Sequence, residues 1–168
     1  MEHFQVAVIG GGPGGYETAI RLNQYQISTV CFEKERLGGV CLNWGCIPTK
    51  ALVKVADLYA EMKHAEEFGI QIRDVKLEFD KVYNRKSQVV EKLVSGIEYI
   101  FKKRNIPVIT KKVDKISKEA GIYSIIAEGE VQCTADYIIL ATGSVPKELP
   151  FMAFDGKSIL SSNEILNI

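Results

Sequence analysis

The chain is poor in histidine and has no excess charge, and these two shortages exclude several kinds of site. Only two histidines, His3 and His64, occur in 168 residues, and 21 basic residues balance 21 acidic ones. Without a net field to steer it, the chain is expected to bind neither nucleic acid nor an anionic membrane. We expect both histidines at the surface, which leaves no candidate for a histidine general base.

Metal-ligand clusters are also missing. Zinc sites usually need four ligands, with a second close pair of cysteines or histidines. Two of the four cysteines, Cys31 and Cys133, stand alone in the sequence, so we expect no metal site. A close cysteine pair in a reducing compartment is more often catalytic or metal-binding, and here metal is the weaker of the two choices.

Long apolar runs are absent as well. The N-terminal apolar run covers only Phe4–Gly12, too short to span a bilayer, and it lacks the basic lead and cleavage site of a signal peptide. A cytoplasmic protein without membrane contact is therefore predicted. With 46% hydrophobic residues, the chain is able to bury the core of one ordinary domain.

Hydrophobic periodicity predicts an α/β fold. Phe4–Ile9 is typical of a strand, Gly10–Gly15 of a turn and Pro13–Gln24 of a helix, and Ser28–Glu33 is typical of a second buried strand. This βαβ unit implies parallel strands joined by a right-handed crossover.

Two longer helices and several short strands are predicted downstream. Helical spacing indicates helices from near Pro48 to about His64 and over Phe79–Lys103. Short strands are expected over residues 106–109, 113–116, 122–127, 130–134 and 137–141, with turns at 119–121 and 128–129. Residues 144–150 are predicted to form an exit linker. The predicted fold is thus Rossmann-like, with a central parallel sheet, helices and a small antiparallel β-meander.

The run GGVCLNWGCIPTK, residues 38–50, places Cys41 and Cys46 five positions apart. A regular helix would hold their Cα atoms about 8.6 Å apart, whereas a disulfide tolerates about 6.8 Å at most. If the two sulfurs bond, the intervening backbone is not regular helix, and Asn43 and Gly45 are residue types that accept unusual dihedrals. Strain of this kind favours a reducible disulfide.

The two cysteines are expected to differ in role. Cys46 stands just before Pro48, and proline is favoured in the first turn of a helix, where the dipole stabilises a thiolate. We therefore expect Cys46 to ionise more readily and Cys41 to be the outward, exchanging thiol. Lys50 lies one helical turn after Cys46, close enough to interact with the same bound group. The alternative is a pair of buried free cysteines that pack as small hydrophobes.

A second motif indicates dinucleotide binding. Gly10, Gly12 and Gly15 form GxGxxG between the first strand and helix, where they allow a tight turn, close approach of a pyrophosphate and close helix packing. Glu33 ends the second strand, where its carboxylate is able to accept hydrogen bonds from a ribose 2′-hydroxyl. Glycine-rich turns serve many folds, but the acid and the βαβ order favour a dinucleotide without a 2′-phosphate.

Together with GGGPGGYETAIRL and ATGSVP, the cysteine run resembles the N-terminal part of the flavin-dependent pyridine-nucleotide disulfide oxidoreductases. The leucine after Cys41 and the IPTK after Cys46 are nearest to the lipoamide dehydrogenase branch. Val40 and Trp44 replace the commonest residues at their positions, threonine and valine. A glutathione-like disulfide and mercuric ion therefore stay open as alternative substrates.

The resemblance implies that the dinucleotide is FAD. Cys46 would face the flavin ring, Lys50 would lie near its N5 atom, Cys41 would exchange with a lipoamide-like dithiol, and main chain at Val113 would lie near the adenine. The implied cofactor-binding residues are Gly10, Gly12, Pro13, Gly14, Gly15, Glu33, Lys34, Gly39, Val40, Cys41, Cys46, Lys50, Val113, Ala141, Thr142 and Gly143.

The resemblance also implies an organisation. Residues 1–150 would be the FAD-binding domain, and residues 151–168 a linker or the start of an absent NAD-binding domain. Longer family members add a second GxGxxG for NAD, a histidine–glutamate base pair and a homodimer interface, which have no counterpart in this sequence. The chain alone is thus expected to be incomplete and inactive, whereas its parent passes electrons from a dithiol through the cysteine pair and FAD to NAD. The alternative is a non-catalytic dinucleotide-binding or thiol-exchange module that acts with a separate chain.

Overall fold

A computed structural model describes residues 1–167. In chain order the elements are β1 (His3–Ile9), α1 (Pro13–Gln24), β2 (Thr29–Phe32), α2 (Gly39–Trp44), α3 (Cys46–Lys63), η1 (Ala65–Phe68), α4 (Phe79–Lys103), β3 (Val108–Ile109), β4 (Val113–Glu119), β5 (Ile122–Ala127), β6 (Glu130–Leu140) and α5 (Ser162–Ile165).

The strands form one six-stranded sheet in the order β3-β2-β1-β6-β5-β4. β1 pairs in parallel with β2 and β6, and β2 pairs in parallel with β3. β4, β5 and the first half of β6 form an antiparallel meander. The predicted Rossmann-like α/β fold, with its parallel βαβ unit and meander, is confirmed.

The prediction of separate strands over 130–134 and 137–141 is wrong, because β6 is continuous. Its middle residue Ala135 is buried and pairs with Phe4 of β1 on one side and Tyr123 of β5 on the other. Because Ala135 has a strand partner on each side, β6 continues through this residue. One strand thus begins in the meander and ends in the parallel part of the sheet.

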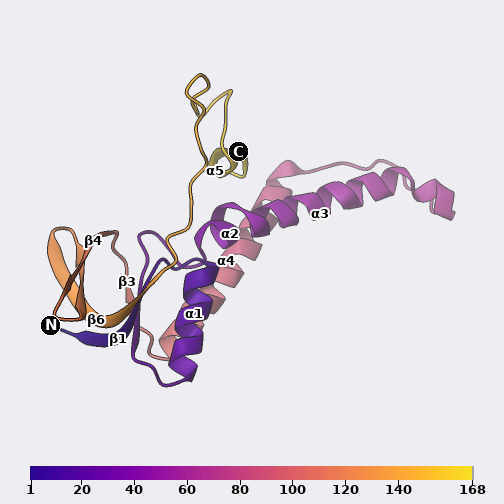
Figure 1. The fold of residues 1–168 in the computed structure, drawn as a ribbon. Helices are drawn as coiled ribbons and strands as arrows, with labels where there is room; N and C mark the ends of the chain where they lie inside the picture. The colour runs from indigo at the N-terminus through magenta and orange to yellow at the C-terminus, as the bar shows by residue number, and fades with distance from the viewer. Residues whose placement is uncertain (168) are drawn as a thin grey trace.

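Two hydrophobic clusters lie on opposite faces of the parallel strands. Along β1, Val6 and Val8 belong to the cluster that packs against the helices, whereas Ala7 and Ile9 belong to the cluster shared with the meander. This alternation is the period-two pattern of a strand buried on both faces. Figure 1 shows α1 and α4 on one side of β1 and the meander strand β4 on the other.

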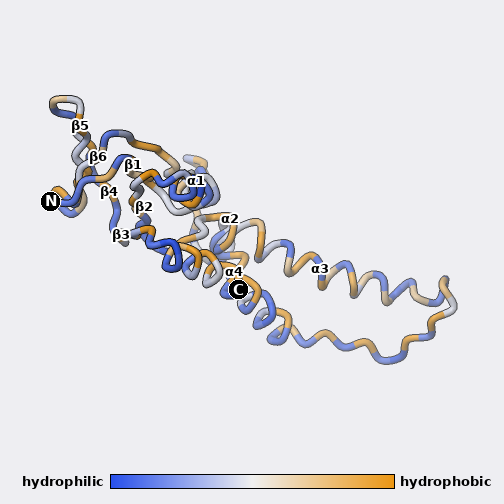
Figure 2. The backbone as a smooth tube through the Cα atoms, turned by 90° about the horizontal axis from the view of Figure 1, so that it is seen from below, coloured by the Kyte–Doolittle hydropathy of each residue, from blue (hydrophilic) through white to orange (hydrophobic). Residues whose placement is uncertain are grey.

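The helices α3 and α4 lie side by side and extend beyond the sheet as a long arm (Figures 1 and 2). α4 has the predicted bounds, and α3 begins at Cys46, two residues before Pro48. Near the tip of the arm, several apolar side chains are exposed: Phe68, Ile70, Leu77 and Phe79.

Beyond β6 the chain leaves the sheet through a segment without helix or strand, as predicted for residues 144–150. It then reaches α5, where Ser161 and Glu164 form a capping box. The segment is tied back to the arm, since buried Lys86 of α4 donates a 2.8 Å hydrogen bond to the Leu166 carbonyl. Within residues 1–167, no helix has the length and apolar character needed to cross a membrane.

Candidate functional site

The glycine turn between β1 and α1 is built by close backbone contacts. A Cβ at Gly15 would lie 1.7 Å from the Gly10 carbonyl oxygen, and one at Gly10, whose φ is +108°, would lie 2.2 Å from the Ala141 carbonyl oxygen. Gly12 differs, because a Cβ there would have only the Gly39 Cα within 4 Å, at 3.7 Å. The turn is therefore packed against protein at Gly10 and Gly15 and open at Gly12.

The N-terminus of α1 suits an anion. Pro13 occupies the first helical position, no described side chain caps the helix at Gly12, and the first turn holds no acidic residue. Backbone N–H groups and the positive end of the helix dipole therefore lie beside the open Gly12. A pyrophosphate fits this arrangement.

Glu33 is buried directly after β2, and each of its two carboxylate oxygens accepts a hydrogen bond from a backbone N–H group. Its Oε2 accepts a 2.7 Å hydrogen bond from the Gly11 N–H, and its Oε1 accepts one of 2.9 Å from the Glu35 N–H. The neighbouring Lys34 is exposed and pairs with Glu35 at 3.2 Å. Glu33 thus joins the end of β2 to the glycine turn.

A cavity of about 350 Å³ opens beside Glu33 at the carboxyl ends of β2 and β3, lined also by Arg36, Leu37, Phe101 and Thr110. In open α/β sheets, ligands bind outside the carboxyl ends of the strands. A larger cavity of about 570 Å³ lies in the C-terminal segment and is lined by Lys157, Leu160 and Asn167 among others. The smaller cavity fits a nucleoside better, because it alone of these two adjoins the glycine turn.

The cysteine run starts directly on the glycine turn. Gly38 and Gly39 have φ of +102° and +55°, and the Gly38 N–H donates a 2.8 Å hydrogen bond to the Gly11 carbonyl. A Cβ at Gly39 would lie 2.6 Å from the Gly12 Cα. The short helix α2, which was not predicted from the sequence, therefore begins in contact with the open part of the glycine turn.

The helix is interrupted between the two cysteines, which is the geometry that a Cys41–Cys46 disulfide would require. α2 ends at Trp44, Gly45 has φ −144° and ψ −110°, and α3 begins at Cys46. The expectation that Asn43 shares in the unwinding is wrong, because Asn43 lies within α2. Its side chain donates to the carbonyls of Leu37 and Gly39 and keeps this residue helical.

The cysteines differ in environment. Cys41 is half-buried on α2, Cys46 is exposed in the first turn of α3, and both are free thiols. A hydrogen bond with Cys46, together with partial burial, raises the pKa of the Cys41 thiol, while the charge of Lys50 opposes this rise. The alternative of two buried cysteines does not hold for this pair, since Cys46 is exposed.

The other two cysteines are the buried ones. Burial is the main cause that raises the pKa of Cys31 to about 12 and that of Cys133 to about 11. Both side chains belong to the hydrophobic clusters on the two faces of the sheet. Thiol chemistry is therefore confined by the fold to Cys41 and Cys46.

Two further residues beside the cysteine run were not expected from the sequence. Tyr16 of α1 packs on the same cluster as Cys41, and its pKa is raised by burial and by the charges of Glu17 and Cys41. Arg36 binds Glu91 of α4 at 3.0 Å. Helical spacing places Tyr16 on the apolar face of α1, whereas the Arg36 pair joins residues 55 apart and leaves no local signal.

The segment after β6 also reaches the glycine turn. The Ala141 N–H donates to the Ile9 carbonyl at 2.8 Å, and the Ala141 Cβ lies 3.5 Å from an ideal Cβ on Gly15. Thr142 and Gly143 follow and are exposed. Ala141 is thus brought to the turn that carries Gly10, Gly12 and Gly15.

The remaining predicted residues lie in different surroundings. Val113 is half-buried at the start of β4 and packs in the cluster between the sheet and the meander. Val40 is exposed on α2, and Gly14 follows Pro13 in the first turn of α1. Their roles as cofactor ligands stay predictions.

Comparison with known proteins identifies the family. The pyridine nucleotide-disulphide oxidoreductase family model matches residues 4–167. The chain belongs to this family. Dihydrolipoyl dehydrogenase of Chlorobaculum tepidum is 41% identical over 164 residues, covering 97% of this chain and 35% of the relative. A dihydrolipoyl dehydrogenase of Bacillus subtilis is 39% identical over 168 residues, covering 97% and 36%.

Among solved structures, LpdA from Mycobacterium tuberculosis superposes with a TM-score of 0.83 at 21% identity, over 100% of this chain and 37% of that protein. This likeness supports the Rossmann-like FAD-binding fold. The chain spans 35–36% of the length of the two curated relatives. The family uses FAD and NAD, which agrees with the cofactors that the resemblance implies.

Proposed function

We propose that the chain binds FAD along the carboxyl edge of its parallel strands. The observation that carries this proposal is the uncapped N-terminus of α1 beside Gly12, the position at which a side chain would fill open space. The pyrophosphate would lie there, the adenosine toward Glu33 and the adjoining cavity, and the flavin toward the cysteine pair and Lys50.

We further propose that Cys41 and Cys46 exchange electrons with a dithiol of the dihydrolipoamide class. A substrate thiolate would attack Sγ of Cys41 in the disulfide form, releasing Cys46 as thiolate and leaving a mixed disulfide. The second substrate thiolate would attack the substrate sulfur of that mixed disulfide and release Cys41, so that the substrate leaves oxidised and the pair reduced.

The parts of the site contribute differently to this exchange. Cys46 lies in the first turn of α3, where the helix dipole stabilises negative charge, and Lys50 adds a positive charge one turn later. When bound, FAD supplies a two-electron acceptor beside the pair, and NAD would take the electrons in a protein of the relatives' length. A homodimer, the NAD site and a catalytic base are likewise proposals for that longer protein.

A direct test uses the purified chain with added FAD and reduced lipoamide. We expect FAD fluorescence to change on binding, and we expect reduced lipoamide to convert the Cys41–Cys46 disulfide to thiols, detected by alkylation and mass spectrometry. Gly12→Asp, which places a carboxylate at the phosphate position, should abolish FAD binding. Gly96→Asp is the control, because Gly96 is exposed on α4 with nothing within 4 Å of an added Cβ.

The results of this test separate the cofactor proposal from the dithiol proposal. Absence of FAD binding by the wild-type chain, or equal binding by both variants, would contradict the cofactor proposal. FAD binding without reduction of the disulfide would contradict the dithiol proposal and favour a non-catalytic dinucleotide-binding module.

A further inference from the structure

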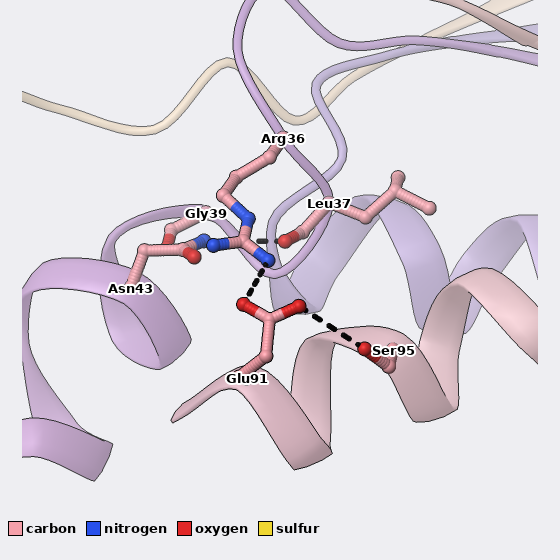
Figure 3. A network of polar contacts seen from close by, with 6 residues as sticks. All are labelled: Arg36, Leu37, Gly39, Asn43, Glu91 and Ser95. Atoms are coloured by element: carbon pink, nitrogen blue, oxygen red, sulfur yellow. Dashed lines mark hydrogen bonds and ion pairs between the residues drawn. The ribbon is translucent and has the colours of Figure 1, made fainter. Parts of the chain in front are cut away.

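Asn43 is a buried polar residue between the two cysteines, with 9% of its surface exposed. Its Nδ2 donates hydrogen bonds of 3.1 Å to the Leu37 carbonyl and 3.0 Å to the Gly39 carbonyl (Figure 3). These two acceptors determine which end of the amide faces the backbone, because only the NH₂ group donates. The side chain therefore spans the left-handed turn at Gly38 and Gly39.

The other end of the amide makes Asn43 unusual. Its Oδ1 is buried and has no hydrogen-bond partner among residues 1–167. A buried acceptor without a partner costs free energy, so the Oδ1 atom does not explain why an asparagine occupies this position. The two hydrogen bonds that Nδ2 donates are the favourable contribution of the amide.

Those two bonds stabilise the N-terminal end of α2. α2 is only six residues long, and no side chain in the described part of the chain caps its N-terminus at Gly38. Two residues before the turn, Arg36 binds Glu91 of α4, which also accepts a hydrogen bond from Ser95 (Figure 3). Asn43 supplies the internal anchor of α2.

The turn at Gly38 and Gly39 connects the cysteine pair to the glycine turn between β1 and α1. Gly39 sits against Gly12, so the start of α2 has a fixed place on the glycine turn. Cys41 follows two residues later, and the helix breaks at Gly45, just before Cys46. The two bonds of the Asn43 amide add to the backbone bond from the Leu42 N–H to the Gly38 carbonyl, and together they tie the helix that carries Cys41 to the turn.

We propose that Asn43 is a positioning residue for the Cys41–Cys46 pair: by binding the carbonyls of Leu37 and Gly39, its amide keeps Cys41 within bonding reach of Cys46. This inference rests on the proposed redox function of the pair. Asn43 would thereby favour formation of the disulfide. Two thiols held close oxidise to a disulfide more favourably than two thiols that move independently.

The test is a redox equilibrium with the 168-residue chain in mixtures of reduced and oxidised glutathione. Formation of the Cys41–Cys46 bond takes two electrons and two protons from the thiols and cleaves one glutathione disulfide to two glutathione thiols. Acid quenching, alkylation under denaturing conditions and mass spectrometry give the fraction oxidised. Asn43→Asp and Asn43→Ala should lower the equilibrium constant for oxidation about tenfold, a shift of about 30 mV in the reduction potential.

Asn84→Asp is the matched control, because Asn84 is exposed on α4, and it should leave the equilibrium constant unchanged. Circular dichroism and thermal melting show whether each variant is folded. Folded Asn43 variants with the wild-type equilibrium constant would overturn the inference. So would unfolding of every Asn43 variant, since Asn43 would then support the whole fold rather than the pair. If the wild-type chain forms no Cys41–Cys46 disulfide in any mixture, the proposed redox function itself fails.

Discussion

The carboxylate of Glu33 accepts a 2.7 Å hydrogen bond from the backbone N–H of Gly11, which lies 22 residues earlier in the chain. Two motifs that the sequence presents separately, the glycine turn and the acid after the second strand, are thus one hydrogen-bonded unit. A Cβ at Gly11 would lie 3.0 Å from Glu33 Oε2, so the contact leaves little room for a side chain at residue 11. Glu33 shapes the turn in addition to its proposed contact with a ribose.

Glu33→Gln should therefore weaken both the fold and dinucleotide binding. A hydrogen bond to a charged group contributes about 1.5–3 kcal/mol, and the amide has only one oxygen to replace the two acceptors used by Gly11 and Glu35. We expect the free energy of unfolding, measured in urea, to fall by about 2 kcal/mol. Glu35→Gln is the control, because Glu35 is exposed and its side chain pairs only with Lys34 in the described residues. Equal losses in both variants would contradict this role.

Alanine at two glycines should have opposite effects. Gly15→Ala would place a Cβ 1.7 Å from the Gly10 carbonyl oxygen, and it should lower the free energy of unfolding by at least about 3 kcal/mol or prevent folding. Gly96→Ala adds a methyl group to an exposed helix position with open space around it, and it should raise that free energy by about 1 kcal/mol. Urea denaturation of both variants checks the pair. A Gly15→Ala variant as stable as the wild type would show that the turn has a different shape.

The sequence predicted the parts of the fold that depend on local patterns. The bounds of α1 and α4 agree with the prediction, because each helix has clear apolar periodicity and α1 begins at a proline. The break at Gly45 agrees with the expectation for a bonded Cys41–Cys46 pair, whose spacing is incompatible with regular helix.

What the sequence did not predict depends on contacts between distant segments. The continuity of β6 requires Ala135 to find partners in two strands that are far apart along the chain. The role of Asn43 was misjudged for a related reason. Its residue type suggests unwinding, whereas the carbonyls of Leu37 and Gly39 lie where they stabilise the helix instead.

Thiol reactivity should separate the four cysteines. Cys46 is exposed and Cys41 is half-buried, whereas Cys31 and Cys133 are buried and have raised pKa values because of that burial. In the reduced, folded chain at pH 8, iodoacetamide should label Cys46 and Cys41 and leave the other two unmodified. Peptide mapping after a timed reaction gives the order, and labelling in urea is the control. Comparable labelling of Cys31 in the folded chain would contradict the buried position.

Stability should also fall in alkaline solution because of Cys31. Burial raises the pKa of this thiol from 9.0 to about 12 in the folded chain. Between these two values the unfolded chain loses the proton and the folded chain keeps it, so the free energy of unfolding decreases as the pH rises from 9. Urea midpoints at pH 8 and pH 10.5 measure this fall. Cys31→Ala removes this titrating group and leaves Cys133, whose pKa is also raised by burial, so the midpoint of the variant should change less than that of the wild type; an equal change would contradict the assignment to Cys31.

The C-terminal segment should detach from the arm when Lys86 loses its charge. The ammonium group is buried, lies 3.7 Å from the centre of the Tyr83 ring and donates to the Leu166 carbonyl at the end of α5. Lys86→Met keeps the apolar stem but removes the donor, which leaves that carbonyl without its bond from α4. We expect amide hydrogen exchange in residues 161–167 to accelerate by about tenfold or more, while exchange in β1 and β6 stays slow. Lys92→Met, at an exposed position of the same helix, should leave both regions unchanged. Unaltered exchange in the Lys86 variant would mean that the segment is held by its other contacts, and a general acceleration would mean that Lys86 stabilises the whole domain.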